Sequence, residues 1–216
     1  MNVIELFSSI DGEGKRQGFL TTFLRLHDCN IRCSYCDTLY SYGPESTFES
    51  MSVQAVADVI EQLDNHRITV TGGEPLLQEP AIIELIDELT RRNARYDFNI
   101  ETNGTIIPSF HRDNVWFTYD YKTPSSLAED AMNLDIFKVA TPADIIKFVV
   151  GSMQDLDRMN EILKTYPTNA QIFVSPVWGN IEGATIIEYM KAHNWQNVRF
   201  QLQIHKFIWD PDAKGV

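Results

Sequence analysis

All three cysteines of this chain lie close together, at Cys29, Cys33 and Cys36, in the spacing C-x3-C-x2-C. Three thiolates on one short loop can converge on a soft metal centre. A zinc ion would need a fourth protein ligand, which His27 or His66 could supply. A redox C-x-x-C pair would use only the last two cysteines and leave the first without a role. A 4Fe-4S cluster held by three cysteines would keep one iron open to a substrate or cofactor.

Short apolar runs alternate with amphipathic segments, and these predict the elements that position the cysteine loop. We predict strands at residues 23–26, 68–71, 98–100, 115–117, 145–150, 172–174 and 198–200. We predict helices at residues 52–64, with Ser52 as the N-cap, and at 80–92, 154–165 and 183–194. Alternation implies a parallel sheet, and the chain is short for a closed eightfold barrel. The expected fold is an α/β incomplete barrel of about six or seven mostly parallel strands with few helices, its chemistry gathered at the carboxyl strand ends.

The composition is that of an ordinary globular protein, with 216 residues, 44% hydrophobic and 22% charged. We expect one domain spanning residues 1–216. A net charge of −12 argues against direct nucleic-acid binding through a basic face. No apolar run reaches the roughly eighteen residues of a membrane span, and the N-terminus does not resemble a signal peptide. The clustered cysteines give no disulfide framework, so a cytoplasmic protein is expected.

The cysteine spacing, with the aromatic Tyr35 before the last cysteine, resembles the signature of the radical S-adenosylmethionine superfamily. Gly72-Gly73-Glu74-Pro75, after the second predicted strand, resembles the glycine-rich element that receives the amino group of S-adenosylmethionine in that superfamily. Alone, this segment would be read as a strand-to-helix turn. Together, the two motifs favour an iron–sulfur radical enzyme over zinc or redox thiols.

Shorter matches along the whole chain resemble one family of that superfamily, the 7-carboxy-7-deazaguanine synthases. They are Ile10 to Gly14, Arg25, Cys36-Asp37-Thr38, Thr71-Gly72-Gly73, Glu101 to Thr105, and His205-Lys206 near the C-terminus. The resemblance implies a lyase that contracts the ring of 6-carboxy-5,6,7,8-tetrahydropterin, with loss of ammonia, to 7-carboxy-7-deazaguanine. This reaction belongs to queuosine and other deazapurine biosynthesis. The resemblance implies that the cluster and S-adenosylmethionine carry the chemistry, so no side chain is assigned as catalytic.

The resemblance also implies which residues hold each group. The three cysteines would hold the 4Fe-4S cluster, and the Thr38 hydroxyl would be the one protein ligand of a Mg2+ ion that binds the substrate carboxylate. The expected cofactor-binding residues are Ser34, Tyr35, Cys36, Gly73, Asp120, Tyr121, Lys122, Ser175, Pro176, Val177 and Trp178. The expected substrate-binding residues are Ile10, Asp11, Gly12, Glu13, Arg25, Thr71, His205 and Val216.

Three segments depart from the family pattern. Asp11 replaces the usual Gln, and a carboxylate accepts hydrogen bonds from a pterin edge but cannot donate. Asp120-Tyr121-Lys122 stands where S-P-K is common, and an aspartate there could accept from a ribose hydroxyl. Residues 175–178 stand where a Q-P motif is common.

Four of the assigned residues also have simpler structural interpretations. Arg25 could form a salt bridge to a neighbouring acid, and Thr38 could cap a loop amide. His205 could be an interior histidine, and Val216 could belong to a frayed tail.

The implied partners are the pterin substrate, an external electron donor of the flavodoxin or ferredoxin type, and a second copy of the chain in a homodimer. One alternative is a small activating enzyme for a glycyl-radical protein, which would share the cysteine loop and Gly-Gly-Glu-Pro but would leave Arg25 and the C-terminal His-Lys without roles. The other is a zinc-binding interaction module. Metal content separates them, since an iron–sulfur protein is brown and a zinc protein is colourless.

Overall fold

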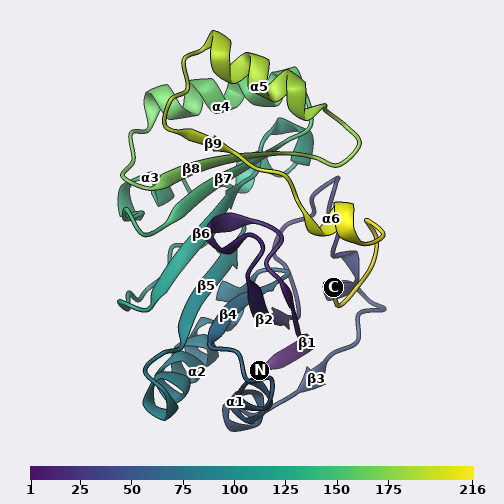
Figure 1. Ribbon diagram of the computed structural model, residues 1–216, viewed down its shortest axis with the longest axis vertical. Coiled ribbons are helices and arrows are strands. Elements are labelled where there is room, and N and C mark those ends of the chain that lie inside the picture. The colour runs from purple at the N-terminus through teal and green to yellow at the C-terminus, as the bar shows by residue number, and fades with distance from the viewer.

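The computed structural model describes residues 1–216 and contains one nine-stranded sheet that runs the length of the molecule (Figure 1). Seven of its strands are parallel to one another: β2 (Leu20–Leu26), β4 (Arg67–Gly72), β5 (Asp97–Thr102), β6 (Val115–Tyr121), β7 (Ile145–Val150), β8 (Gln171–Pro176) and β9 (Val198–Phe200). Two further strands lie beyond β2: β1 (Asn2–Ile10) and β3 (Glu49–Ser50). β1 pairs antiparallel with β2, and β3 pairs antiparallel with β1. The strand order is β3-β1-β2-β4-β5-β6-β7-β8-β9.

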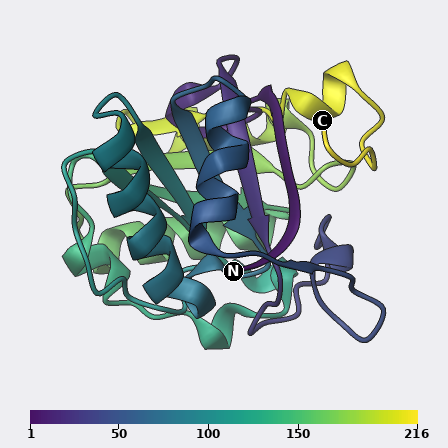
Figure 2. The same ribbon diagram turned by 90° about the horizontal axis from the view of Figure 1, so that it is seen from below.

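The longer helices connect parallel strands and cover the outer face of the sheet. They are α1 (Val53–Gln62), α2 (Glu79–Arg92), α4 (Met153–Thr165) and α5 (Gly183–Ala192). Helices α1 and α2 pack side by side over the first strands, as Figure 2 shows, whereas α4 and α5 cover the β7–β9 end (Figure 1). Two single-turn helices, α3 (Ile136–Val139) and α6 (His205–Ile208), complete the set. No helix is long and apolar enough to span a membrane.

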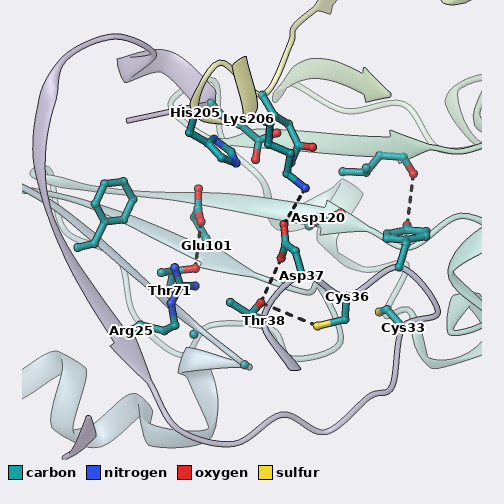
Figure 3. Close-up of a pocket in the computed structure, with 18 of the residues that line it drawn as sticks. Arg25, Cys33, Cys36, Asp37, Thr38, Thr71, Glu101, Asp120, His205 and Lys206 are labelled. Carbon is teal, nitrogen blue, oxygen red and sulfur yellow. Dashed lines mark hydrogen bonds and ion pairs between the residues drawn. The ribbon is translucent and has the colours of Figure 1, made fainter. Parts of the chain in front are cut away.

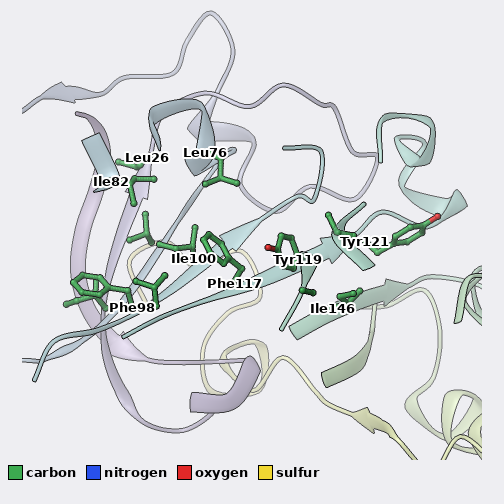
Figure 4. Packing of buried hydrophobic residues seen from close by; sticks show 14 of the residues in the cluster. Leu26, Leu76, Ile82, Phe98, Ile100, Phe117, Tyr119, Tyr121 and Ile146 are labelled. Atoms are coloured by element: carbon green, nitrogen blue, oxygen red, sulfur yellow. The ribbon is translucent and has the colours of Figure 1, made fainter. Parts of the chain in front are cut away.

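Each parallel strand presents an apolar face to the helices and a largely polar face to the interior of the curved sheet. Leu26, Ile100, Phe117 and Ile146 belong to the buried hydrophobic cluster under the helices (Figure 4). Because side chains alternate along a strand, the intervening residues point to the opposite, concave face. That face carries Arg25 on β2, Thr71 on β4, Glu101 on β5, Asp120 on β6 and Lys147 on β7. The alternation of side chains along each strand therefore places the hydrophobic core on one face of the sheet and these polar side chains on the other.

The predicted partial barrel with mostly parallel strands is confirmed. All seven predicted strands and all four predicted helices are present, and the Ser52 hydroxyl caps α1 by accepting from the Ala55 amide at 3.1 Å. The count of six or seven strands was too low, because β1 and β3 were not predicted. β1 has no clear period-2 apolar pattern, and it is stabilised by pairing with β2 along its length. β3 is too short to show a pattern.

Candidate active site

A pocket of about 270 Å³ opens on the concave face, at the carboxyl ends of the parallel strands (Figure 3). Its wall combines the polar strand residues with the cysteine loop, the turn after β1 and the C-terminal segment. Strand register sets part of this wall in a row: Arg25 lies opposite Thr71 on the next strand, and Asp120 lies opposite Lys147. The fold therefore brings residues from most of the chain length to one cavity.

The cysteine loop follows β2 and docks on the glycine pair that ends β4. The Glu74 amide donates to the Asp28 carbonyl at 2.8 Å, and the Gly73 amide donates to the Leu26 carbonyl at 3.2 Å. A Cβ atom on Gly73 would lie 2.0 Å from the Asp28 carbonyl oxygen, closer than any real contact. From the sequence, Gly73 is expected to be a cofactor-binding residue. The structure adds that a glycine is required here for the cysteine loop to dock.

Cys29, Cys33 and Cys36 are free, half-buried thiols that all line the pocket. Burial raises the pKa of the Cys33 thiol to about 11 and also raises the pKa of Cys29, so binding of a metal centre must release protons from both. No three His, Cys, Asp or Glu side chains converge as ligands of a single ion. Three cysteine thiols on one pocket-lining loop are donors of the type that an iron–sulfur cluster takes, so the residues present fit such a cluster.

Arg25 is ion-paired within the pocket wall. Its Nε donates to Glu5 Oε1 on β1 at 2.6 Å, and the Tyr40 hydroxyl donates to the same oxygen at 2.8 Å. Only 17% of the Arg25 side chain is exposed, yet the residue lines the pocket. Because Glu5 contacts the guanidinium at its Nε edge, Arg25 can form this salt bridge and still line the pocket.

A chain of paired charges crosses the pocket floor from the turn after β1 to β6. Lys147 Nζ lies 3.2 Å from Glu13 Oε2 and 3.7 Å from Asp120 Oδ2, and Lys122 Nζ lies 3.0 Å from the same Asp120 oxygen. The carboxylates raise the pKa of both lysines despite burial, so both stay charged. The second oxygens, Glu13 Oε1 and Asp120 Oδ1, are buried without a hydrogen-bond partner. Each buried acceptor of this kind needs an explanation, because leaving it without a partner costs free energy.

Asp11 is a buried acid and Glu101 a half-buried one, and both line the pocket. Burial and the nearby Glu101 charge raise the pKa of Asp11 to about 7, while its oxygens accept from the Thr69 hydroxyl at 3.2 Å and the Glu13 amide at 3.4 Å. Burial also raises the pKa of Glu101, whose carboxylate accepts from the Thr71 hydroxyl at 3.0 Å. The neutral form of Asp11 carries an O–H donor, which the carboxylate lacks.

The C-terminal segment closes one side of the pocket. Lys206 Nζ lies 3.4 Å from Asp37 Oδ2 on the cysteine loop, and Thr38 donates its hydroxyl to Asp37 Oδ1 at 3.2 Å (Figure 3). The His205 ring packs directly on Gly12, where an added Cβ would lie 2.0 Å from His205 Nδ1. Burial lowers the pKa of His205, so its imidazole is neutral at neutral pH. Val216 also lines the pocket.

Eighteen of the assigned residues line the pocket: Ile10, Asp11, Gly12, Glu13, Arg25, Cys29, Cys33, Tyr35, Cys36, Thr38, Thr71, Gly73, Asp120, Lys122, Val177, Trp178, His205 and Val216. Four do not: Ser34, Tyr121, Ser175 and Pro176. Tyr121 follows Asp120 on a strand, so its ring points into the core and its hydroxyl donates to Glu129 at 2.8 Å. The Ser34 hydroxyl donates to the Ser125 carbonyl, and Ser175 is fully buried.

Pocket or near-pocket residues with defined contacts that were not assigned from the sequence include Glu5, Glu101, Asn103 and Lys147. Lys147 carried a signal, because a single lysine inside the apolar run Ile145–Val150 must have a buried partner. Glu101 and Asn103 lay within a motif that supported the resemblance but received no role. Glu5 carried no signal, because its strand was not predicted.

The fold and this cysteine-lined pocket define a radical S-adenosylmethionine protein, and the family model described as "Radical SAM superfamily" matches residues 25–149. The chain is 37% identical to 7-carboxy-7-deazaguanine synthase from Clostridium acetobutylicum, covering 99% of this chain and 98% of that one. It is 36% identical to the Leptospira interrogans protein of the same name, covering 100% and 98%. The chain therefore belongs to the 7-carboxy-7-deazaguanine synthase family.

A solved structure agrees with this fold. The crystal structure of QueE from Escherichia coli superposes with a TM-score of 0.68 over 93% of this chain and 92% of that one, at 24% identity.

Proposed function

We propose that this chain converts 6-carboxy-5,6,7,8-tetrahydropterin to 7-carboxy-7-deazaguanine, with loss of ammonia, for deazapurine biosynthesis. The observation that carries the proposal is one pocket lined both by the three cysteines and by Arg25, Asp11 and Glu13. When bound, the cluster and S-adenosylmethionine supply the radical chemistry that starts the ring contraction. The protein positions the reacting carbon and excludes water.

The cofactor side of the pocket is built around the cysteine loop and Asp120. The three thiolates would hold three irons, and the Asp120 carboxylate, which lines the pocket, would accept from a ribose hydroxyl. Tyr35 stands beside this side, with its hydroxyl donating to the Val149 carbonyl at 3.3 Å, so its ring offers a fixed flat surface for the adenine. In this proposal Asp120, which replaces the serine of the common S-P-K motif, therefore keeps a hydrogen-bonding role.

The substrate side is lined by Asp11, Glu13, Arg25, Thr71 and His205. The Glu13 carboxylate, which lines the pocket, would accept from the amino and ring N–H groups of a pterin. The free edge of the Arg25 guanidinium would bind the substrate carboxylate by a charge-assisted hydrogen bond. Neutral His205 would contact the ring from the opposite side, above Gly12.

We also assign a Mg2+ ion to Thr38. The Thr38 hydroxyl and the Asp37 carboxylate place hard oxygen atoms at the pocket wall, 3.2 Å apart, and such atoms suit Mg2+. In this proposal Thr38 Oγ1 is the direct ligand and Asp37, held by Lys206, orients a metal-bound water.

An external electron donor of the flavodoxin or ferredoxin type is proposed because all three cysteines lie in one loop and leave no others for a second redox centre. A homodimer is proposed on the family resemblance, and its mass in solution tests it.

Anaerobic incubation of the reconstituted protein with S-adenosylmethionine, a reductant and the carboxytetrahydropterin tests the main proposal. The expected result is 7-carboxy-7-deazaguanine, identified by mass spectrometry, together with released ammonia. The matched control omits the pterin and measures uncoupled cofactor cleavage. Cofactor cleavage without any product from the pterin would refute the substrate assignment, and a colourless protein that binds zinc in place of iron would refute the enzyme class.

A further inference from the structure

Asn103 lies directly behind the first cysteine of the loop. It follows β5, is 6% exposed, and its side-chain Nδ2 lies 3.7 Å from Cys29 Sγ. The other two cysteines have no such amide donor. Cys36 Sγ lies 3.8 Å from the Thr38 hydroxyl, but that hydroxyl also lies 3.2 Å from Asp37, an ionic acceptor.

The orientation of the Asn103 amide is fixed by its hydrogen bonds. Its Oδ1 accepts from both the backbone amide and the hydroxyl of Thr105, at 3.0 and 2.7 Å, while Nδ2 also donates to Asn30 Oδ1 at 2.9 Å. A flipped amide would set Nδ2 against the backbone donor and Oδ1 against an acceptor. The N–H end must therefore face the Cys29 sulfur.

The Asn103 backbone is held with equal rigidity. Its amide donates to Glu74 Oε2 at 2.7 Å, and Glu74 is fully buried in the Gly-Gly-Glu-Pro turn. The other Glu74 oxygen accepts from the Thr102 hydroxyl and the Leu76 amide at 2.8 and 2.9 Å. The two sequence motifs are thus joined, and together they aim one side-chain donor at one cysteine.

We propose that Asn103 is a positioning residue that donates a hydrogen bond to the Cys29 thiolate and thereby raises the reduction potential of the cluster this cysteine holds. Reduction by one electron adds negative charge to the cluster and its sulfurs. A fixed N–H donor stabilises the more negative, reduced state more than the oxidised state. The inference rests on the proposed function only in requiring a cluster on the three cysteines, and it needs neither substrate nor product.

The test is an anaerobic redox titration of the reconstituted protein, without S-adenosylmethionine or pterin, followed by the spectrum of the reduced cluster. Asn103→Leu keeps the branched shape of the side chain with somewhat more volume, and Asn103→Ala removes most of the side chain, so a shift shared by both reports the lost N–H donor. We expect the reduction equilibrium constant to fall about tenfold in both, which is about 59 mV toward more negative potential for a one-electron couple. The matched control is Asn30→Ala, which breaks the same network on its exposed side but keeps the donor on Cys29, and its potential should match wild type.

Wild-type potentials in both Asn103 variants would overturn the inference, and so would an equal shift in Asn30→Ala. Loss of iron from both Asn103 variants, with normal iron in wild type and Asn30→Ala, would make Asn103 a structural residue of the loop and also overturn the inference. A wild-type protein that takes up no cluster would overturn the proposed function itself, together with this inference.

Discussion

Replacing Asp11 with Asn should remove a pH dependence of folding stability that the structure builds into the pocket. Asp11 is only 2% exposed, and burial is the largest cause of its raised pKa, followed by the charge of Glu101. Arg16 and the hydrogen bonds from Thr69 and Glu13 act in the opposite direction but do not cancel the burial. Asn is close in size and carries no ionisable proton, so the substitution isolates this effect.

The sign and size follow from proton binding. The pKa of Asp11 rises from 3.8 to about 7 on folding, so between these values the folded protein holds a proton that the unfolded chain has lost. Stability therefore falls as pH rises from about 4 to about 7, and the full cost is present above pH 7. At about 1.36 kcal/mol per pKa unit, that cost is at most about 4 kcal/mol.

The assay is urea unfolding of wild type and Asp11→Asn at a series of pH values from about 4 to about 8. The free energy of unfolding of the variant minus that of wild type should increase steadily over this range. Asp113→Asn, at an exposed position, controls for removing one negative charge from an acidic chain. A difference that does not change with pH, or one matched by Asp113→Asn, would refute the assignment of a buried, proton-holding carboxyl at this position.

Three further predictions concern the cluster, the substrate and the metal. Alanine at Cys29, Cys33 or Cys36 should abolish the iron–sulfur absorbance, since the chain has no spare thiol; parental absorbance in any variant contradicts the three-cysteine assignment. Arg25→Ala should lower kcat/KM for the pterin about tenfold to a hundredfold, because one charge-assisted contact contributes about 1.5–3 kcal/mol, and the cluster content should not change. Loss of the cluster with a normal response to substrate would instead indicate that the Arg25 salt bridge is purely structural. Thr38→Val should raise the Mg2+ concentration needed for half-maximal rate, while Thr38→Ser keeps part of the response; an unmoved Mg2+ curve for Val makes Thr38 a loop-capping hydroxyl.

Much of the fold could be predicted because parallel strands and their crossover helices have strong local patterns. The run Ile145–Val150 is almost wholly apolar, and β7 has those bounds. Residues 2–10 mix apolar and polar side chains on both faces, because one face meets the pocket and the strand lies near the sheet edge. A strand specified mainly by its partner, here β2, leaves little trace in its own sequence.

The same distinction between local and long-range information applies to the candidate site. Motif loops such as the cysteine segment are local, so spacing alone places Cys29, Cys33 and Cys36 together. The charged wall is not local, since Lys147 pairs with Glu13, 134 residues away in the sequence. Sequence position also cannot tell which of two neighbours on a strand faces the ligand, so Tyr121 was assigned with Asp120 although it points to the core.

The pairing of the pocket charges explains how an acidic chain can hold a polar ligand in a buried place. Lys147 is already neutralised by Glu13 and Asp120, and Arg25 by Glu5. A ligand that binds in this pocket as proposed would therefore meet charges that are already paired within the wall. Glu13 Oε1 and Asp120 Oδ1 stay buried without a hydrogen-bond partner, and burying such acceptors costs the folded protein stability.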